Sequence, residues 1–412
     1  MKILQLCKKF PFPLKDGEAI AINALSRALN DLGCEVTLLC MNTTKHFFNI
    51  EDLPSDFNHY KAIHHVKVDT SVKWLDALKN LFQEDSYHIA RFESVAFKER
   101  LIELLKGQTF DIIQLETLYM SPYVPFIRQY SKAKIVMRAH NVEHEIWQRI
   151  TSNTTFLPKK WYLKHLTEKL RQYEIRQLKE YDLLLAITQR DLKRFGRLGY
   201  QNEGMVVPIG LNIDDYPVDF SSFDRPLSLS FIGSLDWMPN QEGLSWFLED
   251  IWPRLTERFP KLSLHIAGRN TPAKMYKLND KRVKVYGEVD SAADFINQHS
   301  VMIVPLLSGS GMRAKILEGM ALNRVVLTTH LGLEGIDADP ERDVLIADTV
   351  NAFVKRIEAI YNRPEKAKEI GRNARYFVEN EYDSLKIGRE MAEKYQLLLY
   401  GKKLSPMSAE NN

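Results

Sequence analysis

The sequence has few cysteines and no long hydrophobic run, and these absences narrow the class of protein. Only three of its 412 residues are cysteines, Cys7, Cys34 and Cys40, and no two of them form a CxxC pair. A sparse, odd set argues against a disulfide framework and for a reducing compartment. No apolar run approaches the roughly 18 residues that a membrane span needs, and the opening MKILQLCKKF is too short for a signal-peptide core. We therefore expect a cytoplasmic protein.

Neither sign of charge is in large excess. The formal net charge is +3, which argues against a dedicated nucleic-acid-binding protein. One predicted helix, over residues 159–180, is more basic: its seven Lys or Arg residues and three Glu residues leave a local charge of +4. Either a solvated helix face or a helix that contacts anionic lipid headgroups explains this pattern. The second interpretation predicts peripheral contact with the inner face of a membrane.

Strand-like and helical segments alternate along the whole chain, which predicts an α/β fold with parallel sheets. The runs are apolar throughout, as expected of strands that are buried on both faces of a sheet. Between the first two strand-like runs, residues 17–33 have the apolar periodicity of a helix that ends at Gly33. The predicted strands are 2–7, 35–40, 111–116, 134–140 and 183–188, then 228–234, 262–268, 283–288, 301–307, 325–329 and 344–348.

Prolines and short polar residues interrupt this pattern over residues 206–226, which we interpret as an interdomain linker. The flanking segments, 1–205 and 227–383, are predicted to form two Rossmann-like, doubly wound domains that face each other across a cleft at the carboxyl ends of their strands. A last helix over 384–400 precedes a polar tail, 401–412.

The segment 308-SGSGMRAKILEGMA-321 has the character of an anion-binding loop. It follows a strand-like run and opens a helix, whose N-terminus offers free N–H groups and a partial positive charge. Arg313 and Lys315 add full positive charges, and Glu318 lies further along the helix, where a carboxylate can accept hydrogen bonds from a ribose diol. These features indicate a nucleoside diphosphate site. The residues alone leave open a plain turn with a surface Lys315–Glu318 pair.

A dinucleotide site is a second interpretation of the same loop. Gly309, Gly311 and Ala314 match the G-x-G-x-x-A variant of a Rossmann fingerprint, which would make the protein an NAD(P)-dependent oxidoreductase. The fingerprint needs an acidic residue at the end of the next strand, about 20 residues further on. Here Glu334 comes late, after a glycine.

Three stretches of the second half, 231-FIGSLDWMPNQEGLSWF-247, 267-AGRNTP-272 and 308-SGSGMRAKILEGMA-321, resemble the donor half of retaining GT-B glycosyltransferases of family 4. The resemblance covers nearly the whole chain. It implies a nucleotide-sugar donor bound mainly by the second domain, an acceptor bound mainly by the first, and a final helix that crosses back to the first. The other similar stretches are 10-FPFPLKDGEAIAINALSRAL-29, 85-DSYHIARFES-94, 114-QLETLYMSP-122, 138-RAHNVE-143 and 207-VPIGLNID-214.

The resemblance implies donor-binding roles for individual residues of the second domain. Glu318 matches the second of two family glutamates and would bind the ribose, whereas Ser310 stands at the first, which usually meets the hydroxyls of the donor sugar. Gly309 and Gly311 flank that serine in the same loop. Ser234, which follows Gly233, and Asn240 stand where the family often has an Arg and a Lys at the diphosphate. Arg313 and Lys315 are therefore the expected substitutes.

In the first domain, His140 matches a histidine that faces the donor sugar, and Gly17 matches part of a glycine-rich turn near the phosphates. The expected catalytic residues are His140, Arg313 and Lys315, with the departing phosphate taking the acceptor proton so that anomeric configuration is retained. No metal or other cofactor is expected, and we interpret the DxD at residues 337–339 as incidental. The residues expected to bind the acceptor are Arg91, Glu116, Arg138 and Glu143.

The acceptor is expected to be a glycan or a lipid-linked sugar in cell-surface polysaccharide assembly, because the first domain has additional basic and aromatic helical segments at 73–83 and 159–180. Replacement of usual donor contacts at Ser234, Asn240 and Ser310 leaves a nucleotide-sugar-binding protein without transferase activity as an alternative. A GT-B sugar epimerase is a further one.

Overall fold

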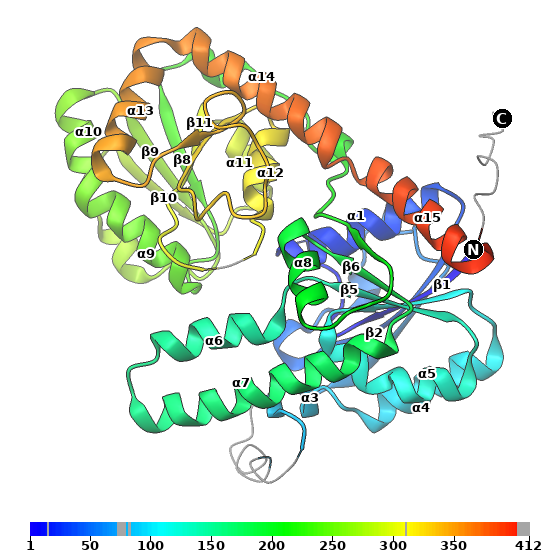
Figure 1. The fold of residues 1–412 in the computed structure, drawn as a ribbon. Helices are drawn as coiled ribbons and strands as arrows, with labels where there is room; N and C mark the ends of the chain where they lie inside the picture. Colours follow the sequence, from blue (N-terminus) through cyan, green and yellow to red (C-terminus); the bar gives the residue numbers. More distant parts are fainter. Residues whose placement is uncertain (15, 72–79, 81–83, 310, 402–412) are drawn as a thin grey trace, which may run out of the picture. The chain divides into compact units, whose positions relative to one another are not determined.

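The computed structural model describes residues 1–14, 16–71, 80, 84–309 and 311–401, which fold into two compact units (Figure 1). The first unit consists of Met1–Gly210 and the last helix, which begins at Ser384, and the second of Leu211–Asp383. The predicted helix over residues 73–83 falls outside the described residues except for Asn80, and Ser310 and the tail beyond residue 401 also fall outside them.

The first unit is built on a parallel sheet with the strand order β3-β2-β1-β4-β5-β6-β7. The chain moves from β1 to one side of the sheet and later crosses to β4 on the other side. The carboxyl ends of β1 and β4 therefore flank a topological switch point, where ligands of open α/β sheets bind. The strands are β1 (Lys2–Cys7), β2 (Glu35–Thr43), β3 (Ala62–Val68), β4 (Ile112–Glu116), β5 (Lys134–Ala139), β6 (Leu183–Ala186) and β7 (Gly204–Val206).

Helices cover both faces of this sheet. Successive strand residues point to opposite faces, so Leu4 and Leu6 of β1 join one hydrophobic cluster and Ile3 and Cys7 join the other. All three cysteines are buried and free. The helices of the unit are α1 (Gly17–Asp31), α3 (Tyr87–Ala90), α4 (Val95–Gly107), α5 (Val124–Tyr130), α6 (Glu143–Asn153), α7 (Leu157–Gln177), α8 (Gln189–Arg197) and α15 (Ser384–Tyr400).

The last helix, α15, belongs to the first unit although the whole second unit precedes it in the chain. Gly388 allows close packing on α1, since a Cβ at that position would lie 2.8 Å from the Cβ of Ala28. Met391 and Tyr395 are completely buried in the core of the first unit. The Tyr395 hydroxyl donates a hydrogen bond to the side-chain oxygen of Gln114, in β4, at 2.7 Å.

The second unit contains a parallel sheet with the order β10-β9-β8-β11-β12-β13, so its switch point lies between β8 and β11. Its strands are β8 (Ser228–Ile232), β9 (Ser263–Ala267), β10 (Val283–Gly287), β11 (Val301–Val304), β12 (Val325–Thr328) and β13 (Leu345–Ile346). Its helices are α9 (Met238–Trp246), α10 (Trp252–Arg258), α11 (Ala292–Asn297), α12 (Ala314–Ala321), α13 (Val350–Asn362) and α14 (Pro364–Glu381).

Two strands of the first unit are absent from the predicted set, namely β3 and β7, the edge strands of the sheet. The segment predicted to be a linker is also structured in part. Val206 ends β7 and pairs with Ala186 of β6, whereas Leu211 pairs with Asp383 inside the second unit. No helix within the described ranges is both long enough and apolar enough to cross a membrane.

Candidate functional site

In the second unit, the loop between β11 and α12 lies at the switch point, where an anion-binding loop was predicted. Gly309 and Gly311 both have positive φ, 108° and 83°, which other residues rarely adopt. Helix α12 begins after Arg313, and the side chain of this N-cap residue does not cap the first turn. The first backbone N–H groups of a helix have no partner within the helix, so they can bind an anion.

Lys315 lies in the first turn of α12 and connects this helix to the end of β8. Its ammonium group donates hydrogen bonds to the side-chain oxygen of Asn240, at 2.9 Å, and to the carbonyl oxygen of Ile232, at 3.2 Å. Gly233 provides the space, since a Cβ there would lie 3.0 Å from the ammonium nitrogen. Asn240 in turn donates to the carbonyl oxygen of Ser234 at 2.8 Å. The structure therefore brings Gly233, Ser234 and Lys315 together.

This contact gives Asn240 a role. The family pattern often has a lysine at that position, and here the asparagine side chain instead binds a lysine supplied by α12. Burial and the neighbouring charge of Arg313 lower the pKa of Lys315 to about 7, although the charge of Glu318 opposes the shift. The ammonium group can therefore lose its proton near neutral pH when no anion is bound.

Arg313 is buried against the same loop. The centre of its guanidinium group lies 5.5 Å from the centre of the Trp237 ring, within the range of a cation–π contact. One of its nitrogens donates to the carbonyl oxygen of Gly311. A Cβ on Gly309 would lie 3.0 Å from another guanidinium nitrogen and 3.3 Å from Trp237. The loop glycines therefore make room for the arginine as well as for positive φ.

Glu318 has a partner that the sequence patterns did not identify. The Tyr216 hydroxyl donates a hydrogen bond to its carboxylate at 3.2 Å. Burial raises the pKa of Glu318 above its usual value, although the bond from Tyr216 and the charge of Lys315 oppose this shift. Tyr216 is itself held through its carbonyl oxygen, which accepts from Arg375 at 2.8 Å. This tyrosine lies in the segment that was interpreted as a linker.

In the first unit, Glu116 and Arg138 do not reach the surface. Both side chains are completely buried, which corrects the expectation that they contact the acceptor directly. One oxygen of the Glu116 carboxylate accepts from Gln5 at 2.8 Å and from Gln114 at 2.5 Å. The other accepts from Arg138 at 3.4 Å and lies 2.7 Å from Nε2 of His140.

This network orients His140 at the carboxyl end of β5. Burial alone would raise the pKa of Glu116, but the charge of Arg138 and the hydrogen bonds from His140 and Gln114 lower it to about 2. At neutral pH an ionised, buried carboxylate therefore contacts one imidazole nitrogen. Glu116 and Arg138 are buried behind His140, which is the partly exposed member of the set.

Helix α1 differs from α12 at its start. The side chain of Asp16 accepts from the backbone N–H of Ala19 at 3.0 Å, and its carboxylate also binds the ammonium group of Lys9. Gly17 is the first residue of the helix, behind this cap. The first turn of α1 is therefore already occupied by a carboxylate, which makes it a weaker anion site than the start of α12.

Next to His140 lies a charged cluster that includes Glu143. Its carboxylate accepts from the Tyr119 hydroxyl at 2.9 Å, and burial raises its pKa to about 7. Lys8 lies 4.7 Å from the centre of the Tyr119 ring and 3.2 Å from the carboxylate of Glu18. Burial would raise the pKa of Glu18, but Lys8, Lys9 and His140 lower it to about 2.

Two further observations mark the same end of the sheet. Thr117 follows β4 with φ of 81°, a conformation that costs a non-glycine residue roughly 1–3 kcal/mol and that is concentrated at functional sites. Arg91 is half-buried, with its guanidinium group 5.0 Å from the centre of the Phe92 ring, and Phe92 packs on Tyr119. Sequence patterns identified Arg91 but did not single out Lys8, Glu18, Thr117 or Tyr119 as site residues.

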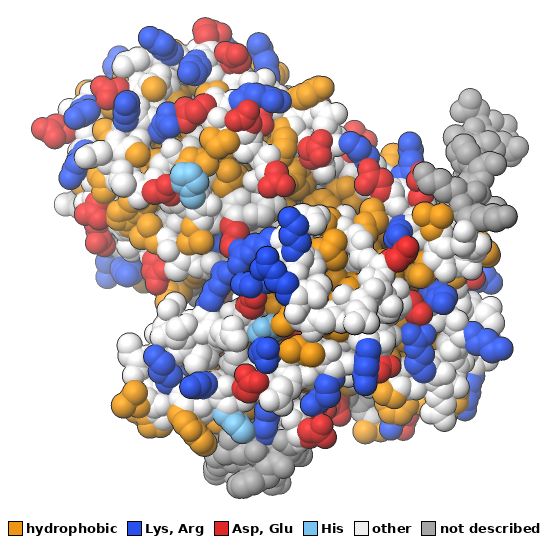
Figure 2. Space-filling model, viewed as in Figure 1, with side chains coloured by type: hydrophobic (Ala, Val, Ile, Leu, Met, Phe, Trp, Pro, Cys, Tyr) orange, Lys and Arg blue, Asp and Glu red, His pale blue; other side chains and the backbone are white. Residues whose placement is uncertain are grey.

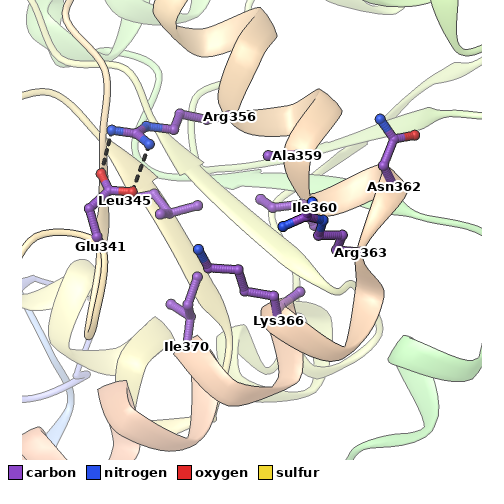
Figure 3. A pocket seen from close by; sticks show the side chains of 10 residues that line it. Glu341, Leu345, Arg356, Ala359, Ile360, Asn362, Arg363, Lys366 and Ile370 are labelled. Carbon is purple, nitrogen blue, oxygen red and sulfur yellow. Dashed lines mark hydrogen bonds and ion pairs between the residues drawn. The ribbon is translucent and has the colours of Figure 1, made fainter.

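A separate cavity of about 330 Å³ opens between α13, α14 and β13 (Figure 3). The Glu341 carboxylate there accepts from Arg356 at 2.6 Å, and the lining includes none of the predicted donor-site residues.

Within the described residues, no group of three or more His, Cys, Asp or Glu side chains is arranged to hold a metal ion.

Comparison with known proteins relates part of the chain to a sequence family. The sequence model of a family described as glycosyl transferases group 1 matches residues 226–363, which include the whole β11–α12 loop. An uncharacterised 44.6 kDa protein from the cps region of Klebsiella pneumoniae is 24% identical over 306 residues, which are 71% of this chain and 76% of that protein.

Solved structures share the fold across both units. Sucrose-phosphate synthase from Thermosynechococcus elongatus superposes with a TM-score of 0.71 and 15% identity, over 98% of this chain and 100% of that one. HepE from Anabaena, solved in complex with UDP, superposes with a TM-score of 0.65 and 11% identity, over 96% of this chain and 100% of that one. HepE in complex with UDP-glucose superposes with a TM-score of 0.63 and 13% identity, over 96% of this chain and 99% of that one. Residues 226–363 of this chain therefore match the group 1 glycosyl transferases, and the chain has the GT-B-like fold of these solved structures.

Proposed function

We propose that this protein transfers a sugar, with retention of anomeric configuration, from a UDP- or GDP-sugar to a glycan or lipid-linked acceptor in cell-surface polysaccharide assembly. The observation that carries the donor part is the start of α12, which the Arg313 side chain does not cap, together with Arg313, Lys315 and the Tyr216–Glu318 pair. Relatives support the rest: HepE binds UDP and UDP-glucose, and one relative is encoded in a cps region.

The leaving group of this reaction is a nucleoside diphosphate, and negative charge grows on its β-phosphate as the glycosidic bond breaks. Arg313, protonated Lys315 and the first N–H groups of α12 would stabilise that charge. Losing one preorganised donor at such a site costs roughly 3–4 kcal/mol in the barrier. The departing phosphate would take the proton of the acceptor hydroxyl on the same face of the sugar, which accounts for retention without a separate enzymic base.

In the first unit, we propose that His140 hydrogen-bonds the donor sugar through the imidazole nitrogen that Glu116 does not occupy. Arg91 and Glu143 would bind acceptor hydroxyls together with Lys8 and Glu18, and Gly17 would leave space for the phosphates. The lipid-linked form of the acceptor would bring the protein into peripheral contact with the inner face of the membrane.

Nucleotide binding tests the proposal. Wild type, Glu318→Ala and a matched control, Glu257→Ala on the exposed face of α10, are titrated calorimetrically with UDP, GDP, ADP and NAD, with and without EDTA. We expect one nucleoside diphosphate to bind, EDTA to change nothing, and only Glu318→Ala to weaken binding, by at least tenfold, or about 1.4 kcal/mol. Binding of NAD in place of the diphosphates would overturn the donor assignment.

A second assay separates a transferase from a binding protein. Wild type that binds a nucleotide sugar should also hydrolyse it slowly in the absence of acceptor, and NMR of the released or transferred sugar should show the original anomeric configuration. Tight binding with no turnover, across acceptor extracts and prolonged incubation, would favour a nucleotide-sugar-binding protein.

A further inference from the structure

The end of the hairpin formed by α6 and α7 exposes an unusual group of hydrophobic side chains. Their exposed fractions are 43% for Ile150, 66% for Phe156, 76% for Leu157 and 65% for Trp161. All four fall within twelve consecutive residues, whereas the other exposed large hydrophobic residues described in this unit lie far apart in the chain. Single exposed hydrophobic residues are common, but a contiguous group indicates an interaction surface.

All charged side chains of the same segment are basic. From Arg149 to Lys164 the sequence contains four Lys or Arg residues and no Asp or Glu. We call residues 149–164 the hairpin tip. Figure 2 shows hydrophobic side chains at this end of the hairpin, at the lower left, with Lys and Arg side chains beside them. An apolar group surrounded by cations complements a surface that is apolar below and negatively charged above.

The structure moves the predicted lipid contact from the face of α7 to this tip. Leu163 and Leu166 point inward, and Leu166 packs on Tyr87. The cations further along α7 already have partners: Lys169 donates to the carbonyl oxygen of Asn80 at 2.9 Å, and Arg176 pairs with Asp85 at 2.6 Å. Two of the seven cations that make the helix basic therefore bind groups within the protein.

The base of the hairpin is held firmly. The carboxylate of Glu174, in α7, accepts from the backbone N–H groups of Glu143 and His144 at 2.9 and 3.2 Å, and it binds the His144 ring at 2.5 Å. The His144 and Glu143 side chains open α6, three residues after His140. Helix α6 has 11 residues, so it spans about 16 Å at 1.5 Å per residue.

We propose that the hairpin tip inserts into the headgroup region of a bilayer that contains anionic lipids. Trp161, Phe156 and Leu157 would enter the boundary between headgroups and acyl chains, where aromatic residues are enriched. Lys159 and Lys164 would bury their methylene stems and keep their ammonium groups at the lipid phosphates. The inference deepens the proposed function and depends on it in one respect, namely that the acceptor is linked to a lipid. Helix α6 would then hold the acceptor site about one helix length from the membrane that contains this lipid.

Vesicle flotation of the full chain tests this surface, with vesicles of phosphatidylcholine alone or with 30% phosphatidylglycerol. Each Lys near an anionic surface contributes about fivefold to partitioning, so neutralising three of them should weaken binding to the anionic vesicles about a hundredfold. Replacing the three largest hydrophobic side chains should weaken it at least tenfold. The two test variants are Lys159→Gln/Lys160→Gln/Lys164→Gln and Phe156→Ser/Leu157→Ser/Trp161→Ser.

Control variants change exposed lysines or exposed hydrophobic residues elsewhere on the first unit, and each should alter flotation less than twofold. They are Lys61→Gln/Lys106→Gln/Lys132→Gln, at exposed lysines, and Phe47→Ser/Val95→Ser, at exposed hydrophobic residues. Nucleotide affinity should be unchanged in every variant, which separates this proposal from the proposed function and confirms that the variants fold.

Quenching of tryptophan fluorescence by brominated lipids provides a second readout that needs only one mild substitution. The chain has six tryptophans, and the quenched fraction should disappear in Trp161→Phe. The proposal is overturned if wild type does not float with anionic vesicles, if the test variants float like the controls, or if quenching persists in Trp161→Phe. A dimer that depends on the tip, without flotation, would overturn it in favour of a second copy as the occupant.

Discussion

Binding of a nucleoside diphosphate should cause Lys315 to become protonated. In the free protein, burial and the charge of Arg313 lower the pKa of this lysine to about 7. A diphosphate at the start of α12 would place two or more negative charges beside the ammonium group, which favours its charged form. The group then titrates far above neutrality in the complex, so binding and protonation are linked.

The magnitude follows from that pKa. In the free protein about half of the Lys315 side chains are protonated at pH 7 and about a tenth at pH 8. If nearly all are protonated in the complex, binding takes up about 0.5 proton at pH 7 and about 0.9 at pH 8. Affinity should therefore fall about fivefold over that pH unit, or about 1 kcal/mol.

Isothermal titration calorimetry measures the uptake directly. UDP is titrated at pH 7 and pH 8 in two buffers with different ionisation enthalpies, and the difference in observed enthalpy gives the number of protons exchanged. Lys315→Met keeps the length of the side chain and its apolar stem but cannot be protonated. Any proton exchange that comes from the ionisation of UDP itself is also present in this variant, which therefore serves as the control. The variant should bind more weakly at pH 7 and lose the pH dependence.

Equal proton uptake in wild type and Lys315→Met would refute this reasoning. So would an affinity for UDP that stays constant between pH 7 and pH 8 in wild type. Either result would mean that the lysine is already fully charged without ligand or that it does not face the diphosphate.

Three further predictions concern other groups. Tyr216→Phe removes the hydroxyl that binds Glu318 and should weaken UDP binding severalfold, with little change in kcat. It should also reduce the preference for UDP over 2′-deoxy-UDP. An unchanged preference would contradict a role in ribose recognition. Glu116→Ala leaves a buried arginine without its carboxylate and should lower the free energy of unfolding, measured in urea, by about 3–5 kcal/mol. Glu116→Gln should be more stable than Glu116→Ala. It should nevertheless lower kcat, because the His140 imidazole loses its charged partner. The buried pair His265 and His299 should make the second unit acid-sensitive, because burial lowers their pKa values to about 4 and about 3. Their contribution to stability is complete above about pH 6.5. Between about pH 6.5 and about 4 it falls by about 1.4 kcal/mol per ring and pH unit, and between about 4 and about 3 only His299 continues to lose stability. His265→Gln should halve the slope between about pH 6 and about pH 4.

Most strands that the sequence predicts have side chains buried on both faces, although β10, a partly exposed edge strand, was also predicted. Runs such as 111-DIIQLE-116 are apolar because helices cover each side of the sheet. Strand β3 escaped prediction because it pairs only with β2 at the edge of the sheet and carries His64, His65 and Lys67 at partly exposed positions. Strand β7 has only three residues and lies at the other edge.

Site residues divide along similar lines. The β11–α12 loop could be predicted because its glycines, cations and glutamate lie within ten residues of each other. Tyr216 could not, since it lies 102 residues from Glu318 and local patterns carry no information about such a pair. The buried carboxylate of Glu116 contacts Gln5 of β1, Gln114 of β4 and His140, which follows β5. Its place at the end of an apolar run gave no sign of these contacts.

The return of α15 to the first unit has a consequence for synthesis of the chain. Met391 and Tyr395 complete a core that also contains Ile22 and Leu25, yet about 360 residues are made between the two sets. During translation the second unit is finished first, while α1 still presents an uncovered apolar face. A ribosome that stalls before residue 384 would therefore release a chain with one complete domain and one that exposes hydrophobic surface, a substrate for chaperones and proteases.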